Sequence, residues 1–273
     1  MCIGPHPAVT RYAALTPARS ATLRRMGDDL FRVSHTKIRS FSDCRKQYWF
    51  RYVSGIEKPP KVESTPGIIG NGVHRAMKVV TETGEADRGA EELDTYLRMP
   101  LHESAAPGSE HYTIAFQLFA AGCAAHNSIE SVDRWAERDT WVPWRSRGFT
   151  ASARLDRADR FADGSFQVID WKTGSWDMAE IADAQLDLSN VAARTTFRIP
   201  RETTVFAVSW NLRSGERRER PLRRIDAEAT MRKIAALALA MQAESTFEAT
   251  PGHQCNLCEW RPQCPDSERE WEE

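Results

Sequence analysis

The spacing of apolar residues predicts a chain in which helices surround a small number of strands. A helix is expected from Ser34, with Ser34 or Thr36 as its cap, through an aromatic cluster to about Val53. Prolines and glycines at 59–60 and 64–67 predict a loop before a second helix, which carries His74. Residues 89–139 predict further helices that are interrupted near 106–109. Their inward face is marked by Ile114, Leu118, Phe119, Ala121 and Ala125.

In the second half of the chain, apolar and polar residues alternate as they do in β-strands. A β-hairpin is predicted around residues 162–164, and Trp135, Trp141 and Trp144 come just before its first strand, where they can pack on its edge. A helix with Gln185 follows, and then a strand over 203–210 that is rich in β-branched and aromatic residues. Ser214-Gly215 turns this strand into an arginine-rich one. A last helix runs from Ala227 to about Ser245, with Met231, Ile234, Leu237 and Met241 as core candidates.

The hairpin carries the clearest chemistry. Asp170 and Lys172 are two residues apart, so on a strand they point to the same face. A two-residue turn would send Asp156 to the opposite face, whereas a three-residue turn with a left-handed Gly164 places Asp156 across from Asp170. Two facing carboxylates repel unless a cation lies between them. The three-residue turn is therefore predicted, with the two aspartates binding a divalent cation of the kind used in phosphodiester cleavage.

His74 lies in the first turns of a helix with a glycine-rich entry from Gly67 to Gly72. Imidazole is a common ligand for transition metals. Taken alone, however, a histidine at such a position is more often an ordinary, partly buried side chain. Its interpretation depends on the motifs around it.

Three stretches together resemble the RecB-like branch of the PD-(D/E)XK nuclease superfamily. They are the G-x-x-x-H segment from Gly70 to His74, the stretch from Gly148 to Asp159 with its D-R-x-D ending, and the I-D-W-K-T-G segment from 169 to 174. The resemblance implies an α/β restriction-endonuclease-like core, with a mixed central sheet flanked by helices. It also implies that Asp156, Asp170, His74 and the Trp171 carbonyl hold Mg²⁺ or Mn²⁺, and that Lys172 is catalytic.

One motif departs from that family. Many members carry Gln-x-x-x-Tyr on the helix after the hairpin; here Gln185 matches, but Ser189 stands in place of the tyrosine. The resemblance implies that Gln185 orients the DNA phosphate or the attacking water, and the alternative is an ordinary amide on a helix surface. The missing tyrosine ring affects the expected substrate preference more than the reaction type.

The cysteines give an independent signal. Cys255, Cys258 and Cys264 close the chain in a C-x-x-C-x5-C arrangement, and Cys44 lies near its start. Four thiolates can bind zinc or an iron–sulfur cluster, and their spacing alone does not separate the two. Similarity to AddB-type and CRISPR-associated RecB-like exonucleases implies a 4Fe–4S cluster that ties the two chain ends together. Cys2 and Cys123 do not fit this pattern; we expect a disordered terminus and a buried helix position.

Composition changes this picture only locally. The formal net charge is −1, which does not indicate a nucleic-acid ligand, but six arginines fall between Arg213 and Arg224. A second basic stretch, 45–61, is interleaved with aromatic residues. Such runs are usually solvated surfaces, yet cations beside aromatics also suit single-stranded DNA or a DNA end. The DNA-binding candidates are Arg45, Lys46, Tyr48, Arg217 and Arg218.

The remaining features define the organisation and the class of protein. Residues 1–27 have four arginines, no acid and no periodicity, which predicts a disordered leader ahead of a single domain over 28–273. There is no secretory signal, no apolar run of about 20 residues that would span a membrane, and no G-x-x-x-x-G-K-[ST] motif, so we expect a cytoplasmic protein without its own ATPase.

The sequence thus predicts a Mg²⁺- or Mn²⁺-dependent deoxyribonuclease that acts on single strands or DNA ends. Its partners would be DNA and, as the resemblance implies, a separate helicase or CRISPR or recombination proteins. The pathway stays open among DNA repair, CRISPR adaptation and phage DNA metabolism. The alternative from another class is a non-catalytic DNA-binding or adaptor protein that keeps the fold and the cluster.

Overall fold

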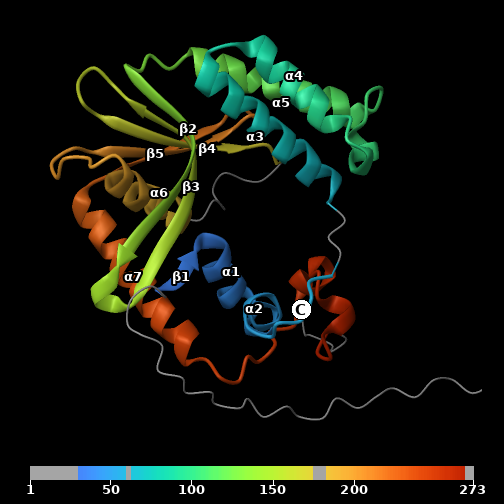
Figure 1. Cartoon of the computed structure of the whole chain (residues 1–273), viewed down its shortest axis with the longest axis vertical. Helices are drawn as coiled ribbons and strands as arrows, with labels where there is room; N and C mark the ends of the chain where they lie inside the picture. Colours follow the sequence, from blue (N-terminus) through green and yellow to red (C-terminus); the bar gives the residue numbers. More distant parts are fainter. Residues whose placement is uncertain (1–29, 60–62, 175–182, 268–273) are drawn as a thin grey trace, which may run out of the picture.

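A mixed six-stranded sheet forms the centre of the protein (Figure 1), which is described by a computed structural model over residues 30–59, 63–174 and 183–267. The long hairpin of β2 (Asp133–Trp144) and β3 (Phe149–Arg160) is antiparallel. On its other side β3 pairs with β1 (Phe31–Ser34) in parallel and with β4 (Phe166–Lys172) antiparallel. β4 continues in parallel to β5 (Val205–Asn211), which pairs with the antiparallel edge strand β6 (Arg217–Leu222). The α/β class with a mixed sheet is therefore confirmed.

Helices cover both faces of this sheet (Figure 1). On one face lie α3 (Thr65–Thr83), α4 (Ala86–Leu97) and α5 (Glu110–Asn127), which pack on Ile169, Trp171 and Val208. On the other lie α6 (Asp183–Thr196) and α7 (Arg224–Ala243), where the alternate residues Val168 and Ala207 are buried. Burial on both faces explains why β4 and β5 are almost continuously apolar.

The two ends of the described chain pack against each other. A single helix was predicted from Ser34, and Ser34 does cap α1 (His35–Asp43) by accepting a hydrogen bond from the Lys37 amide. Extended backbone at Cys44 then separates α1 from α2 (Arg45–Tyr52), so the prediction of one helix was wrong. The C-terminal segment folds into short 3₁₀ turns at His253–Leu257 and Arg261–Gln263. It is joined to α2 by the stacked rings of Phe50 and Trp260, whose centroids are 5.2 Å apart.

The prediction of helices up to residue 139 was also wrong. A short 3₁₀ turn (Pro100–Ala105) separates α4 from α5, and α5 ends at Asn127; the chain then enters β2 at 133. Trp135, Trp141 and Trp144 lie in β2, which precedes β3 in the chain and pairs along its edge, as predicted for the hairpin around 162–164. Charged residues over 133–139 hid the strand, because β2 is an edge strand whose side chains are mostly in contact with solvent.

The sequence also predicts a disordered leader and no membrane-spanning segment. The disorder predicted for residues 1–27 lies outside the described residues. Over 30–59, 63–174 and 183–267, no helix combines the length and apolarity needed to cross a membrane.

Candidate active site

The turn between β3 and β4 sets the geometry of the site. Gly164 has φ +82°, and its amide donates to the Phe161 carbonyl at 3.0 Å. The Phe161 amide donates to the Ser165 carbonyl, also at 3.0 Å. These contacts are those of a three-residue turn with glycine in the left-handed position, as predicted.

From this turn the ladder continues to the pair Arg157–Ile169 and then stops, although β4 remains paired with β5 as far as Lys172. One position beyond the last pair, the same register places Asp156 across from Asp170. The Trp171 amide donates to Asp156 Oδ2 at 2.9 Å, where a regular ladder would supply a backbone carbonyl. The two strands therefore separate at the aspartates, and the Asp156 carboxylate fills the gap in the backbone hydrogen bonding.

Asp170, Lys172 and Gln185 form a contact group on the α6 side of β4. Lys172 Nζ lies 2.5 Å from Asp170 Oδ2 and 3.3 Å from Gln185 Oε1. Gln185 Nε2 donates to Asp170 Oδ1 at 2.7 Å. Burial, together with the nearby Asp156 carboxylate, raises the pKa of Asp170 to about 6, and the Lys172 ammonium only partly offsets this.

His74 reaches the same group from α3. Its Nδ1 lies 3.4 Å from Asp156 Oδ2. Burial disfavours the imidazolium, but the Asp156 and Asp170 carboxylates outweigh burial and raise the pKa of His74 to about 9. A close approach of the helix is needed for this contact: a Cβ on Gly70 would lie 3.1 Å from Thr173 Oγ1, and one on Gly72 would lie 2.9 Å from a Leu93 methyl. The glycine-rich entry of α3 thus lets it approach both the end of β4 and α4.

These residues are chemically suited to a hard divalent cation. Two carboxylates converge, and Asp170 Oδ2 is buried without a hydrogen bond of acceptable geometry, despite its close contact with Lys172. In the described part of the chain, no three His, Cys, Asp or Glu side chains are arranged as a ready metal-binding group. Here the charges of Lys172 and protonated His74 balance the two carboxylates, as a metal ion would do in their place.

Arg157 and Asp159, in the same D-R-x-D motif, are directed elsewhere. Both are fully buried, and Arg157 holds Asp159 through three contacts of 2.8–3.0 Å. His126 of α5 lies between Arg157 and Arg134, with ring nitrogens 2.8 and 2.9 Å from their guanidinium groups. Burial and these two cations lower the pKa of His126 to about 4. The motif therefore supplies one residue to the site and two to a buried ionic network.

The four predicted cysteine ligands line one small cavity between the chain ends: Cys44, Cys255, Cys258 and Cys264. Their sulfurs also accept hydrogen bonds, from the Thr250 amide to Cys44 at 3.5 Å and from Gln47 to Cys258 at 3.6 Å. All four are free thiols, and in the described residues they do not form a ready metal-binding group. Cys123 is half-buried on α5, as expected for a helix position apart from this group, and Cys2 lies outside the described residues.

The predicted DNA-binding residues are scattered. Arg45 makes an ion pair with Glu244 at 2.9 Å, and Lys46 lies over the Trp49 ring. Arg217 and Arg218 are neighbours on β6, and Arg217 also donates to Gln167. Tyr48 is only 2% exposed, and its ring packs on Phe41 and Phe247, so it belongs to the core and has no face free for a base.

Two contributors to the site were not predicted from the sequence. The Trp171 amide holds Asp156, a role that no side-chain pattern reveals. His35, at the start of α1, lies close enough to be affected by the site: burial, with the charges of Arg39 and Lys172, lowers its pKa. Its position directly after the Ser34 cap is the only sequence signal that could have drawn attention to it.

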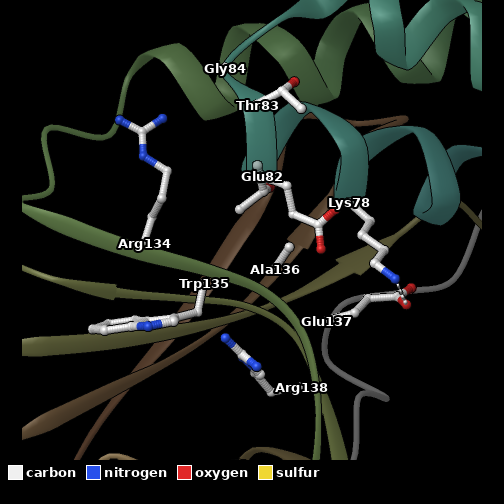
Figure 2. Close-up of a pocket in the computed structure, with 10 residues that line it drawn as sticks. Lys78, Glu82, Thr83, Gly84, Arg134, Trp135, Ala136, Glu137 and Arg138 are labelled. Carbon is white, nitrogen blue, oxygen red and sulfur yellow. Dashed lines mark ion pairs between the residues drawn. The ribbon is translucent and has the colours of Figure 1, made fainter.

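A polar hollow of about 750 Å³ lies between the end of α3 and β2 (Figure 2). Lys78, one helical turn after His74, forms an ion pair with Glu137 at 3.9 Å. Glu82 lies near Lys78 on α3, and Arg134 lies on β2 (Figure 2). None of the predicted metal ligands lines it. Its charges are of both signs and largely balance, so it adds no strong field to the site.

The family model of the PD-(D/E)XK nuclease superfamily matches residues 32–265, which include the sheet from the second residue of β1 onward and all of the candidate active-site residues. The chain belongs to this superfamily. Nucleases of this superfamily generally use divalent metals such as Mg²⁺, and DNA is the substrate that family membership suggests.

Solved structures agree at the level of the fold. A crystal structure described as "Putative exonuclease" from Eubacterium rectale is 11% identical, with a TM-score of 0.50, and the match covers 88% of this chain and 89% of that chain. A structure described as SSO0001 is 15% identical over 84% of this chain and 94% of that chain, with a TM-score of 0.31, which is too low to carry an argument. No curated protein matches the chain.

Proposed function

We propose that this protein is a Mg²⁺- or Mn²⁺-dependent deoxyribonuclease, with exonuclease action on single strands or DNA ends. The observation that carries the proposal is the convergence of Asp156, Asp170 and His74 with Lys172 and Gln185 at the point where β3 and β4 separate. Membership of a nuclease superfamily supports the reaction class. The choice of DNA ends rests on the family resemblance.

Asp156, Asp170, His74 and the Trp171 carbonyl would hold the metal ion, with carboxylates as the principal ligands. When bound, the metal supplies a Lewis acid for the scissile phosphate and lowers the pKa of a bound water. Lys172 would position the attacking water or stabilise the charge that develops on the phosphate. Gln185, already bonded to both Asp170 and Lys172, would hold their side chains in place.

His74 differs from the carboxylates because it must lose a proton before it can bind a metal ion. An imidazole binds a metal only when neutral. Burial lowers the pKa of His74, but the Asp156 and Asp170 carboxylates outweigh burial and raise this pKa to about 9. Metal binding through His74 therefore has to release a proton near neutral pH. His74 accordingly fits as a ligand whose contribution grows as the pH rises.

At the chain ends, we propose that Cys44, Cys255, Cys258 and Cys264 hold a 4Fe–4S cluster, with zinc as the alternative. Their convergence on one cavity supports a shared metal, although the free thiols must rearrange to ligate it. A cluster there would link α2 to the C-terminal turns and so hold the two ends of the domain together.

For the DNA surface, we propose Arg45, Lys46, Arg217 and Arg218, without Tyr48. Separate helicase, CRISPR or recombination proteins remain proposed partners, since no ATPase motif was found in the sequence.

The test is digestion of 5′- and 3′-labelled single- and double-stranded DNA by Asp170→Asn, with Asp163→Asn as the matched control. Both changes replace a carboxylate by its amide within one hairpin, but Asp163 lies in the exposed turn. Asp170→Asn should lose at least about 10³-fold in rate, whereas Asp163→Asn should cleave like the wild type. Cleavage by Asp170→Asn at the wild-type rate would contradict the assignment of this site. No metal-dependent cleavage by the wild type would contradict the nuclease proposal and favour the adaptor alternative.

A further inference from the structure

A second hollow, of about 560 Å³, lies between the end of β2, the second half of α6 and the first half of α7. Its floor is apolar and belongs mainly to the core packed around Ala151 and Ala235, with Ile199 contributed by the neighbouring core around Val205. The buried floor residues are Val142, Val191, Ile199 and Met231. This volume is typical of a pocket that accepts a small ligand or one bulky side chain.

The rim of this hollow is strongly cationic. It contains five arginines and one glutamate: Arg147, Arg194, Arg201, Arg224, Arg232 and Glu228. Glu228 is paired with Arg224 at 2.7 Å, and Arg194 is held by the Thr203 and Leu222 carbonyls at 2.7 and 2.9 Å. Arg201 and Arg232 are exposed and make no ion pair within the described part of the chain. A net positive rim in a chain of net charge −1 indicates an anionic ligand.

The hollow is separate from the candidate active site. It is lined by Val191, Arg194 and Thr195 of α6, and Thr195 is ten residues beyond Gln185. Ten residues correspond to about 15 Å along a helix. None of the proposed metal ligands, cysteines or DNA-binding arginines lines it.

The lining favours a peptide over a nucleic acid. A nucleobase would lose hydrogen bonds to water on entering a floor that is aliphatic apart from Trp144. The Trp144 ring already packs against Phe149, with centroids 5.7 Å apart, and the Arg147 guanidinium lies 6.0 Å from its centroid. Thr195, the one hydroxyl there, already donates to the Val191 carbonyl at 3.0 Å. The chain's own residues 1–27, which lead into β1 beside Gly148, contain four arginines and no acid, so the rim would repel them.

We propose that this arginine-rimmed pocket binds an acidic peptide of a partner protein, which inserts one bulky apolar side chain. Carboxylates of the peptide would pair with Arg201 and Arg232, since guanidinium groups bind carboxylates through two parallel hydrogen bonds. The apolar side chain would cover Met231 and Ile199. This inference does not depend on the nuclease proposal.

The test is fluorescence anisotropy of the full chain with a labelled Asp-Glu-Asp-Phe-Glu-Asp peptide. Two control peptides replace the Phe by Ser, or all acids by their amides; each should bind at least about tenfold more weakly. Arg232→Glu and Arg201→Glu should weaken binding at least about fivefold, and Thr195→Trp should block the pocket from its exposed rim. Arg88→Glu, an exposed arginine on α4, is the matched control and should bind like the wild type.

Three results would overturn the proposal. Equal binding of all three peptides would show that the pocket recognises neither the acids nor the Phe. An eight-nucleotide oligothymidine could displace the peptide, and Arg201→Glu and Arg232→Glu could weaken the binding of both ligands equally. These two results together would assign the pocket to nucleic acid. Self-association that Arg232→Glu removes, without peptide binding, would assign it to a second copy's residues 268–273, whose sequence Glu-Arg-Glu-Trp-Glu-Glu is acidic and carries a tryptophan. DNA cleavage should be unchanged in every variant.

Discussion

Asp156 and Asp159 are three residues apart on β3, and each belongs to a charged cluster that includes a histidine from a helix. Asp159 is fully buried and is held by Arg157 and Gln167. Asp156 instead lies near a second carboxylate, that of Asp170, where burial and mutual repulsion raise the pKa of Asp170 to about 6. In the first cluster Arg157 neutralises the single carboxylate of Asp159 directly. In the second, two carboxylates lie together and are balanced by Lys172 and protonated His74, whose charges a bound metal ion would replace. The difference separates a structural network from a binding site built from the same residue types.

The histidines report the same contrast. Burial acts on both, but two carboxylates raise the pKa of His74 to about 9, and burial with two guanidinium groups lowers the pKa of His126 to about 4. Neighbouring charge thus decides the ionisation of each ring.

Removing one partner from the buried network should have the largest effect on stability. Arg157→Ala leaves the Asp159 carboxylate buried without its counter-ion, so the free energy of unfolding should fall by about 3–5 kcal/mol in urea denaturation. Arg154→Ala, whose partner Asp139 is 63% exposed, is the matched control on the same strand and should cost less than about 1 kcal/mol. Equal losses in the two variants would remove the distinction between the clusters.

Asp170→Asn should raise the free energy of unfolding, whereas Arg157→Ala lowers it. The pKa of Asp170 is raised, by burial and Asp156, from 3.8 to about 6, so the folded state binds more protons than the unfolded state between these values. Ionised Asp170 therefore reduces stability above pH 6, and this cost disappears as the pH falls to 4. At pH 8, without metal, Asp170→Asn should stabilise the protein by about 1–3 kcal/mol, measured by urea denaturation. Destabilisation at pH 8 would contradict this account of the site.

The two histidines should give opposite pH dependences of stability, of up to about 3 kcal/mol each. Burial lowers the pKa of His74, but Asp156 and Asp170 outweigh burial and raise this pKa to about 9. Protonated His74 therefore stabilises the fold below pH 6.5, and this stability is lost as the pH rises to 9. The lowered pKa of His126, due to burial and Arg157, means that stability falls as the pH decreases from 6.5 to 4, because only the unfolded state takes up the proton. NMR titration of the metal-free protein should show His74 protonated at pH 8 and His126 neutral at pH 5. Similar pKa values for the two rings would refute the contrast.

Gln185→Ala should have the smallest effect among these changes. Loss of its amide removes one hydrogen bond to Asp170 and one to Lys172 but no charge, so cleavage should slow by about tenfold with little change in stability. Ser189→Ala, one turn along α6, removes only a hydroxyl bonded to the Gln185 carbonyl and should retain activity. A single-turnover assay distinguishes the two variants, and equal rates would show that Gln185 has no role in positioning.

The sequence predicted local geometry well where one residue determined it. Gly164 required the three-residue turn, and that turn fixed the register of Asp156 against Asp170. The spacing of Asp170 and Lys172 placed both on one face of β4. The separation of β3 from β4 was not predictable, because it depends on a hydrogen bond from the Trp171 amide to the Asp156 carboxylate in place of a backbone carbonyl.

Errors arose where packing decided the outcome. Tyr48 was assigned to DNA binding from its basic and aromatic neighbours, but α2 turns its ring into the core against Phe41. The prediction of helix over β2 was wrong because an edge strand exposes charged residues on much of its surface. Such features follow from which face of an element is covered, and a local pattern does not carry that information.

Manganese binding tests the central claim most directly, because it does not depend on cleavage. Electron paramagnetic resonance of free Mn²⁺ at pH 8 should show that the wild type and Asp163→Asn bind the ion. Asp156→Asn and Asp170→Asn should each lose at least about tenfold in affinity. Unchanged Mn²⁺ affinity in both folded variants would contradict the assignment of these carboxylates as the metal site.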